Sequence, residues 1–372
     1  MSKIVKILCL STNGILSDGI TSWMKTVFSA MDLNGFEVTT TAFVGCSLDI
    51  VESVRQCGIN VEIVPNRKSD TLNYMRAIRN LLETGHFDIV HVCCNSATAA
   101  FEISEAKRCG VAVRIAHSHN TMCTHRFANS LLDPFFQKGI TDRFACGVDA
   151  GKWLFGSKQF TVIPNGKNLS QFSYSSKVRE VVRSELGFSD DESVFGHVGS
   201  FNKQKNHEKL LAIFIELSRR NSHSRLVLVG EGPKLSEIKN KVELLGIENA
   251  VSFLGRRDDV PRLLNAMDCM VFPSLYEGFP NVVLEWQLNG LPVVMSETIT
   301  DECAITPLVS QVSLNASAAI WADAIEDALK GRNRALDSAS GVNSARTAGY
   351  DIRDNAATLR RLYMEGVNRC KN

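Results

Sequence analysis

The chain has 372 residues, more than one ordinary hydrophobic core requires, so we expect two domains. Its composition, 44% apolar and 22% charged, is typical of a folded globular protein and excludes an intrinsically disordered chain. The 41 Lys and Arg residues balance 40 Asp and Glu residues, and this near-neutral charge argues against nucleic acid as the main partner.

The N-terminal apolar run, residues 4–10, predicts a β-strand because it ends at Ser11, too early for the apolar region of a signal peptide. No run approaches the ~20 apolar residues that a membrane-spanning helix needs. The 11 cysteines are scattered without a Cys-x-x-Cys pair, which indicates reduced thiols rather than a disulfide framework. We therefore expect a cytoplasmic protein, with contact at the inner face of a membrane left open.

Strand-like apolar runs alternate with helical patterns in the first half, which predicts a parallel sheet with flanking helices. The expected strands are residues 5–10, 38–44, 61–64, 89–93, 111–116, 144–146 and 161–163. Helices are expected between them, for example at 21–33, 71–83 and 98–109.

The turn residues Pro164-Asn165-Gly166 interrupt this pattern, as expected at a domain junction. A second alternation predicts strands at 194–198, 226–229, 251–254, 270–272 and 293–295. We expect an N-terminal domain of residues 1–164, a C-terminal domain of residues 165–346, and a terminal helix within 347–372 that packs back on the first domain. The predicted fold class is α/β, with two doubly wound Rossmann-like domains whose parallel sheets face each other across a cleft.

The most informative pattern lies between the last two predicted strands. It reads Pro273-Ser274-Leu275-Tyr276-Glu277-Gly278-Phe279-Pro280-Asn281, and Glu285 follows on a helix closed by Gly290. Such loops bind ligands in open α/β sheets, and a helix start favours an anion. Two carboxylates beside a phosphate site suit a nucleotide sugar. The alternatives are an ordinary loop acid with a helix acid, and the acid–base pair of a glycoside hydrolase, which the helix N-terminus disfavours.

Three further loops point to the same ligand class. Lys203 and Lys205 precede a predicted helix and suit a diphosphate, although a solvated polar loop is an equal alternative. Gly230-Glu231-Gly232-Pro233 follows a strand and permits close backbone approach, a weak signal alone. His117 and His119 follow a strand of the first domain and suit a substrate hydroxyl or phosphate, although a single histidine is more often structural. The loop after the first strand lacks Gly-x-Gly-x-x-Gly, which argues against a nicotinamide oxidoreductase.

The segment 125–138 mixes aromatic and basic residues. It would suit contact with a membrane or a lipid-linked acceptor. We favour the alternative that it is an ordinary helix packed on the first sheet.

The chain resembles, nearly end to end, a retaining glycosyltransferase of the GT-B fold in group 1 (family 4). The most specific match is Glu277-x7-Glu285, supported by Gln204-Lys205-Asn206, Gly230-Glu231-Gly232-Pro233, Pro164-Asn165-Gly166 and Phe253-Leu254-Gly255. More narrowly, Arg114-Ile115-Ala116-His117-Ser118-His119-Asn120 and Trp153-Leu154-Phe155-Gly156 resemble enzymes that build capsular or exopolysaccharide repeat units.

The resemblance implies transfer of a sugar from a nucleoside diphosphate, a UDP-sugar, to a glycan or lipid-linked glycan, without a metal or other cofactor. It implies catalytic roles for His117, Lys205 and Glu277, and an acceptor side formed by His117 and His119. The implied donor site is Gly19, Ser200, Lys205, Gly230, Gly255, Arg256, Glu277, Gly278, Phe279, Pro280, Asn281 and Glu285.

Two positions depart from the family pattern. Ser200 stands where an arginine is usual, and Asp18-Gly19 stands where two glycines are usual, which places an acid near an anionic ligand. These departures leave open a non-catalytic subunit that needs a glycosyltransferase partner. A sugar-nucleotide epimerase of the same two-domain architecture is a further alternative, disfavoured by Glu277-x7-Glu285.

Overall fold

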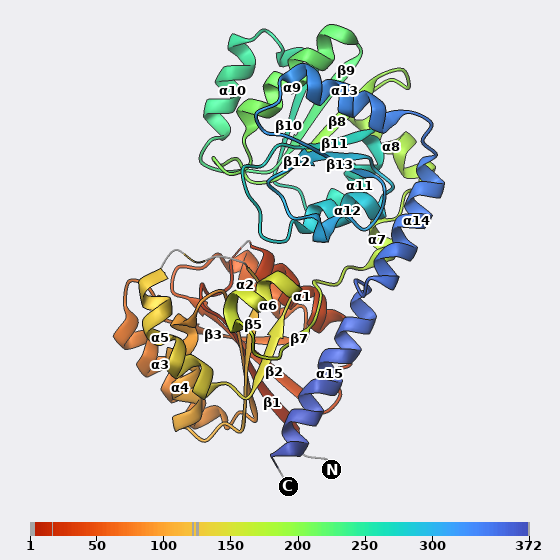
Figure 1. Ribbon diagram of the computed structural model, residues 1–372. Helices are drawn as coiled ribbons and strands as arrows, with labels where there is room; N and C mark the ends of the chain where they lie inside the picture. The colour runs from red at the N-terminus through yellow and green to blue at the C-terminus, as the bar shows by residue number, and fades with distance from the viewer. Residues whose placement is uncertain (1–3, 17, 121–122, 124–125, 371–372) are drawn as a thin grey trace. The chain divides into compact units, whose positions relative to one another are not determined.

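The computed structural model describes residues 4–16, 18–120, 123 and 126–370. The chain forms two compact units, Met1–Lys167 with Gly349–Asn372 (unit 1) and Asn168–Ala348 (unit 2) (Figure 1). Among the residues described, no helix is long and apolar enough to cross a membrane.

Unit 1 is built on a parallel sheet in the order β3-β2-β1-β4-β5-β6-β7. Its strands are β1 (Val5–Ser11), β2 (Phe36–Phe43), β3 (Ile59–Val64), β4 (Ile89–Cys94), β5 (Val113–Ser118), β6 (Asp142–Ala145) and β7 (Thr161–Val162). Its helices are α1 (Gly19–Ala30), α2 (Leu48–Arg55), α3 (Thr71–Gly85), η1 (Ala97–Ala99), α4 (Ala100–Arg108), α5 (Arg126–Gly139), α6 (Val148–Phe155) and α15 (Ile352–Arg369). The central strands are buried on both faces, as expected for a parallel sheet covered by helices.

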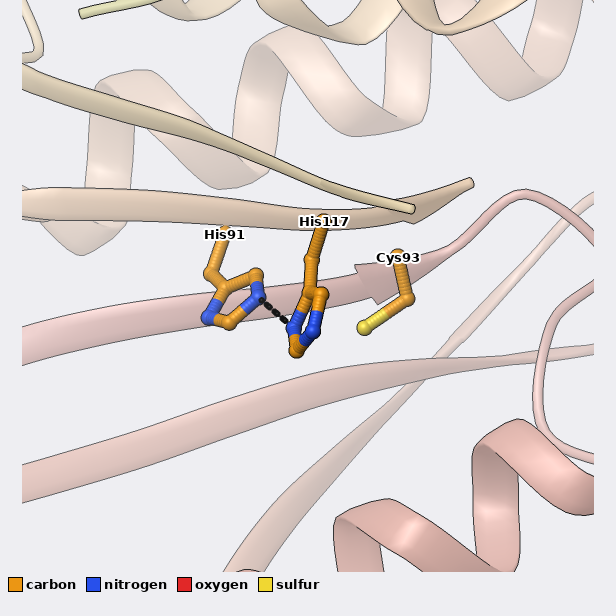
Figure 2. A group of neighbouring side chains, drawn as sticks. All are labelled: His91, Cys93 and His117. Carbon is orange, nitrogen blue, oxygen red and sulfur yellow. Dashed lines mark hydrogen bonds between the residues drawn. The ribbon is translucent and has the colours of Figure 1, made fainter. Parts of the chain in front are cut away.

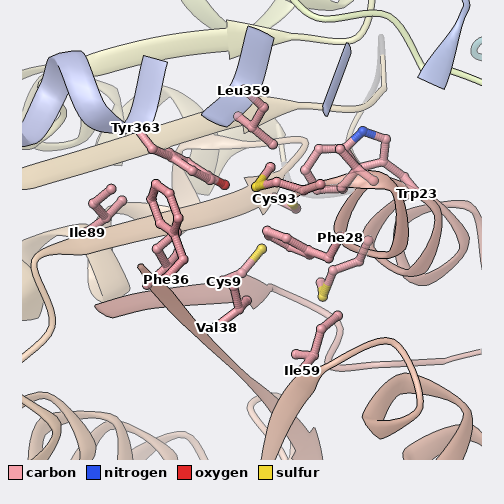
Figure 3. Close-up of a cluster of buried hydrophobic side chains, with 14 of the residues drawn as sticks. Cys9, Trp23, Phe28, Phe36, Val38, Ile59, Ile89, Cys93, Leu359 and Tyr363 are labelled. Carbon is pink, nitrogen blue, oxygen red and sulfur yellow. The ribbon is translucent and has the colours of Figure 1, made fainter. Parts of the chain in front are cut away.

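One face of this sheet is covered by α1, α2 and α15, and the other by α3, α4, α5 and α6. Figure 3 shows the first core, in which Trp23 and Phe28 from α1 meet Leu359 and Tyr363 from α15 over the strands. Helix α15 therefore completes a core whose strands all come from the first half of the chain.

Unit 2 is built on a second parallel sheet, in the order β10-β9-β8-β11-β12-β13. Its strands are β8 (Ser193–Val198), β9 (Ser224–Val229), β10 (Val251–Gly255), β11 (Cys269–Phe272), β12 (Val293–Ser296) and β13 (Val309–Val312). Its helices are α7 (Leu169–Phe172), α8 (Ser176–Leu186), α9 (His207–Arg220), α10 (Leu235–Leu244), η2 (Glu248–Ala250), α11 (Val260–Leu263), η3 (Leu264–Ala266), α12 (Asn281–Leu288), η4 (Asp301–Cys303), α13 (Ala318–Leu329) and α14 (Arg334–Thr347). The α/β class with two doubly wound parallel sheets is confirmed.

The strand order of unit 2 changes direction beside β8. The chain first runs outward from β8 to β9 and β10, and then returns to place β11 on the other side of β8. Open α/β sheets bind ligands at such a switch point, beyond the carboxyl ends of the two strands. The loops that follow β8 and β11, residues 199–206 and 273–280, meet there.

Candidate functional site

An ion pair joins the two loops at the switch point of unit 2. The Lys205 ammonium lies 2.7 Å from Glu277 Oε1, with both side chains largely shielded at 14% and 10% exposure. The ammonium also lies 4.6 Å from the centroid of the Phe272 ring, at the end of β11. Two candidates that are 72 positions apart in sequence are thus in direct contact.

Three hydrogen bonds to backbone carbonyl oxygens, one from a backbone N–H and two from side-chain amides, join the two loops. Leu275 N donates to Gln204 O at 2.8 Å, and Gln204 Nε2 donates to Tyr276 O at 2.9 Å. Asn206 Nδ2 donates to Pro273 O at 3.1 Å, and its backbone is left-handed with φ of 52°. Asparagine tolerates this conformation better than most residues, and α9 can then begin at His207.

Gly230 and Gly232 let the neighbouring loop approach very closely. A Cβ at Gly230 would lie 2.1 Å from Gly199 O, and one at Gly232 would lie 2.5 Å from Phe201 O. Both residues have positive φ, 141° and 156°. These glycines are therefore required for backbone-to-backbone packing, a structural reason distinct from the ligand approach expected from the sequence.

The start of α12 follows the Glu277 loop directly. Pro280 precedes the helix, and no side chain caps its first turn. Asn281 Oδ1 is buried and has no hydrogen-bond partner among the residues described. The half-buried Glu285 lies one turn further along. The helix start thus offers N–H groups and partial positive charge beside the Lys205–Glu277 pair.

The other residues predicted to bind the sugar donor lie on neighbouring loops of unit 2. Ser200 and Arg256 are exposed, and Gly255 ends β10 with φ of 65°. Gly278 and Phe279 are half-buried between Glu277 and α12. Thus the unit 2 candidates lie at the carboxyl end of one sheet, on its loops, at the end of β10 and on the first turns of α12, while their individual roles stay predictions.

Two buried histidines beside Lys205 were not singled out from the sequence. His197 Nδ1 lies 2.9 Å from Val271 O, so this nitrogen carries the proton and leaves Nε2 as a lone pair. His207 stacks on Phe201 and has no partner for either ring nitrogen among the residues described. Burial, with the Lys205 charge, lowers the pKa of His207 to about 4. Their positions in a strand and at a helix start gave no sequence signal beyond their residue type.

In unit 1, His117 and His119 at the carboxyl end of β5 join a third histidine, His91, from the middle of β4. The rings of His117 and His119 lie 4.1 Å apart, and Trp23 packs against all three histidines. Burial lowers the pKa of His91 and of His119 to about 3 and that of His117 well below its usual value. All three are therefore neutral near pH 7.

His91, Cys93 and His117 lie close enough to be considered as metal ligands (Figure 2), with one donor atom of each within 4.8 Å of the others. However, His91 already pairs both ring nitrogens, with Tyr363 Oη at 2.6 Å and His117 Nδ1 at 3.1 Å. Burial also raises the pKa of the Cys93 thiol well above its usual value, so the thiolate that a metal requires is disfavoured. We interpret the cluster as a hydrogen-bonded network.

The remaining unit 1 candidate, Gly19, is exposed and begins α1. Asp18, whose acidity beside an anionic ligand departs from the family pattern, caps this helix by accepting a 2.9 Å hydrogen bond from Thr21 N. The acid at this position therefore has a structural reason.

Comparison with known proteins agrees with this arrangement. Residues 178–340 match the family model described as glycosyl transferases group 1. The chain is 30% identical over 367 residues to the putative glycosyltransferase EpsF of Bacillus subtilis, covering 94% of each chain. It is 27% identical over 260 residues, 66% of each chain, to an Escherichia coli UDP-Gal:alpha-D-GlcNAc-diphosphoundecaprenol alpha-1,3-galactosyltransferase.

The fold is similar to that of Anabaena Alr3699/HepE, solved in complex with UDP and glucose. The TM-score is 0.78 at 18% identity, over 97% of this chain and 100% of that chain. A sucrose-phosphate synthase of Thermosynechococcus elongatus also gives a TM-score of 0.78, at 16% identity, over 97% and 98%. These structural likenesses show the same fold, and the match to EpsF over 94% of the chain confirms the family resemblance. The chain belongs to the group 1 glycosyltransferases.

Proposed function

We propose that this enzyme transfers a sugar, with retention of anomeric configuration, from a UDP-sugar to a glycan or lipid-linked glycan in surface polysaccharide synthesis in the cytoplasm. The observation that carries the proposal is the shielded Lys205–Glu277 pair beside the start of α12, at the switch point of unit 2. EpsF-like sequence along the whole chain and the named donor of the E. coli relative support it.

In this proposal the donor lies along the two loops of unit 2. Glu277 and the backbone of Gly278, Phe279 and Pro280 bind sugar hydroxyls, while Glu285 binds the ribose. The diphosphate lies at Asn281, with Ser200 and Gly230 on the facing loops, and Gly255 with Arg256 borders the base. For the unit 1 candidates we propose the roles that the family resemblance implies, donor binding for Gly19 and an acceptor role for His117 and His119.

The chemistry requires stabilisation of a departing diphosphate. Lys205 and the dipole of α12 supply positive charge fixed in advance, which is the most effective kind of transition-state stabilisation. We expect transfer to proceed without a divalent metal, because Lys205 and the start of α12 would supply the positive charge that a metal supplies elsewhere.

Helix α5 of unit 1 has an apolar outer surface. Phe127, Leu131 and Phe135 recur every fourth residue and are 85%, 63% and 66% exposed. The inner side of the helix packs, with Phe136 fully buried and Asn129 accepting a 2.7 Å hydrogen bond from Ala97 N. His125, which begins the segment singled out from the sequence, lies outside the described residues. The proposal places this apolar stripe against the lipid of a membrane-borne acceptor; the E. coli relative is named for a diphosphoundecaprenol-linked acceptor.

A panel of nucleotide sugars tests the donor assignment by thermal stabilisation. At a concentration of about 100 Kd, the correct donor should raise the Tm of unit 2 by about 5–10 °C, because it binds only the folded state. Glu285→Ala should keep the fold and lose most of this shift, while the matched Glu237→Ala on α10 keeps it. Equal shifts in both variants would contradict the assignment.

Transfer by the purified chain separates an enzyme from a non-catalytic subunit. With the stabilising donor and a lipid-linked acceptor, the chain alone should form product in buffer containing a chelator. Product only after a partner protein is added would favour the subunit. Conversion of the donor with no acceptor present would favour an epimerase.

The α5 stripe predicts binding to anionic phospholipid vesicles. The triple variant Phe127→Ser, Leu131→Ser, Phe135→Ser should lower vesicle affinity at least about 10-fold, because each exposed side chain loses apolar burial in the bilayer. Cosedimentation measures this effect. Leu244→Ser on α10, an 87% exposed leucine, is the control and should bind as the wild type does. An unchanged triple variant would remove α5 from the membrane contact.

A further inference from the structure

A chain of three polar side chains runs through the unit 1 core from the last helix to the end of β5. The Tyr363 hydroxyl lies 2.6 Å from His91 Nδ1, and His91 Nε2 lies 3.1 Å from His117 Nδ1. All three residues are 0% exposed. The rings are fixed by packing, since Trp23 and Phe144 contact both histidines.

Each hydrogen bond in this chain has two possible directions, and the two must agree. If Tyr363 donates to His91 Nδ1, His91 donates from Nε2 to His117 Nδ1, and His117 carries its proton on Nε2. If the direction is reversed, His117 donates from Nδ1 and keeps a bare lone pair on Nε2. The direction therefore decides whether His117 Nε2 is a donor or a base.

The number of buried polar atoms left without partners separates the two directions. His91 is the only partner of the Tyr363 hydroxyl within the described part of the chain, and His117 Nε2 has none. In the first direction, one donor, the Nε2–H of His117, stays unpaired. In the reversed direction, the tyrosine O–H and the His117 lone pair both stay unpaired. Since each unpaired buried group is costly, the first direction is favoured.

The tyrosine also keeps its proton under all ordinary conditions. Burial raises the pKa of Tyr363 well above its usual value, because a buried phenolate would lose its hydration. The hydroxyl therefore remains available as the donor at the head of the chain.

We propose that Tyr363 is a positioning residue that acts through His91 to hold His117 with its proton on Nε2. His117 then carries a hydrogen-bond donor, rather than a base, on a nitrogen that is buried near the carboxyl end of β5. The proton positions do not depend on the proposed function. Only the idea that this N–H bonds an oxygen of the sugar donor or of the glycan acceptor rests on it.

Proton positions can be read directly from nitrogen chemical shifts in protein labelled with ¹⁵N-histidine. The chain has 8 histidines, few enough to assign by single substitutions. In the wild type, more than ~90% of molecules should carry the proton on Nε2 of both His91 and His117. A bare Nε2 on His117 would overturn the proposal.

Tyr363→Phe tests the head of the chain. Without the hydroxyl, both directions leave two unpaired groups, so His91 and His117 should become mixtures of the two tautomers. The matched control is Tyr74→Phe, which also removes a buried hydroxyl of unit 1, one that bonds Glu102 at 3.0 Å on the other side of the sheet. It should leave both tautomers unchanged. Unchanged tautomers in Tyr363→Phe would equally overturn the proposal.

Steady-state kinetics of the same two variants distinguish a positioning role of Tyr363 from a general disturbance of the fold. Once a donor is identified, Tyr363→Phe should lower kcat at least about 3-fold with KM for the nucleotide sugar unchanged, while Tyr74→Phe leaves kcat unchanged. Changed tautomers with unchanged kcat would overturn the part of the proposal that concerns transfer. If the wild-type protein transfers no sugar at all, the proposed function fails while the nitrogen shifts still decide the proton positions.

Discussion

Lys205→Met should lower kcat for sugar transfer by about 100- to 1000-fold, because it removes a cation fixed beside the departing diphosphate. The loss should fall mainly on kcat, since charge on the leaving group grows in the transition state. Lys205→Arg, which keeps the charge but changes its geometry, should recover part of the rate. Steady-state kinetics with the donor identified by thermal shift measures all three proteins.

The control for Lys205→Met is Lys209→Met, four residues further along. The Lys209 ammonium donates a hydrogen bond to Ala316 O and takes no part in the Lys205–Glu277 pair. It should leave kcat within about 2-fold of the wild type. Lys205→Met leaves the carboxylate of the shielded Glu277 without its partner, which could itself disturb the fold. The double variant Lys205→Met, Glu277→Gln removes that unpaired charge, so it distinguishes the loss of the cation from a disturbed fold. A fully active Lys205→Met protein would be incompatible with the proposed site.

Acid should destabilise both units in the range where free histidine titrates. Burial lowers the pKa of His91 to about 3 and of His207 to about 4, and it lowers the pKa values of His117 and His197 well below 6.5. The unfolded chain then binds more protons than the folded chain. Stability is complete above about pH 7 and falls as the pH drops from 6.5 toward 4.

The magnitude is large because the histidines act together. The three neutral histidines of unit 1, His91, His117 and His119, together remove on the order of 3 kcal/mol of unfolding free energy between pH 6.5 and 5.5. Urea unfolding at several pH values, with proton uptake measured in weak buffer, tests this expectation. His207→Phe should flatten the pH dependence of unit 2, since it replaces an unpaired imidazole stacked on Phe201 by an apolar ring. Equal acid sensitivity in this variant would contradict the assignment to buried histidines.

The sequence was sufficient for the core strands and insufficient at one edge. Each predicted strand overlaps one of β1–β12. The central strands were visible because strands buried on both faces consist of nearly continuous apolar residues. Strand β13, Val309–Val312, was missed since it lies at the sheet edge with Ser310 and Gln311 between its two valines. Its pairing with β12 depends on tertiary contact, which a pattern of four residues does not reveal.

For the candidate site, the sequence indicated the residue types but not the contacts between them. The strand–loop–helix pattern around Glu277 and the motif Gln204-Lys205-Asn206 were each visible alone. Their direct pairing follows from the strand order β8-β11, which joins segments 72 positions apart. The network behind His117 was likewise not predictable, since His91 and Tyr363 are separated by 272 positions. In the sequence, His91 is one residue of an apolar strand and Tyr363 one residue of the terminal helix, so neither indicates a functional role.

The contribution of α15 to unit 1 has a consequence for synthesis on the ribosome. Ile352, Leu359 and Tyr363 fill the core over β1 and β4, yet they are made after the whole of unit 2. At ordinary translation rates the gap between residues 167 and 352 lasts on the order of 10–40 s. During that time the face of the first sheet that α1 and α2 cover still lacks α15, whereas unit 2 is one contiguous segment and is made in full before α15. We therefore expect unit 2 to be able to complete its fold before unit 1, which leaves apolar surface of the nascent N-terminal half exposed for longer.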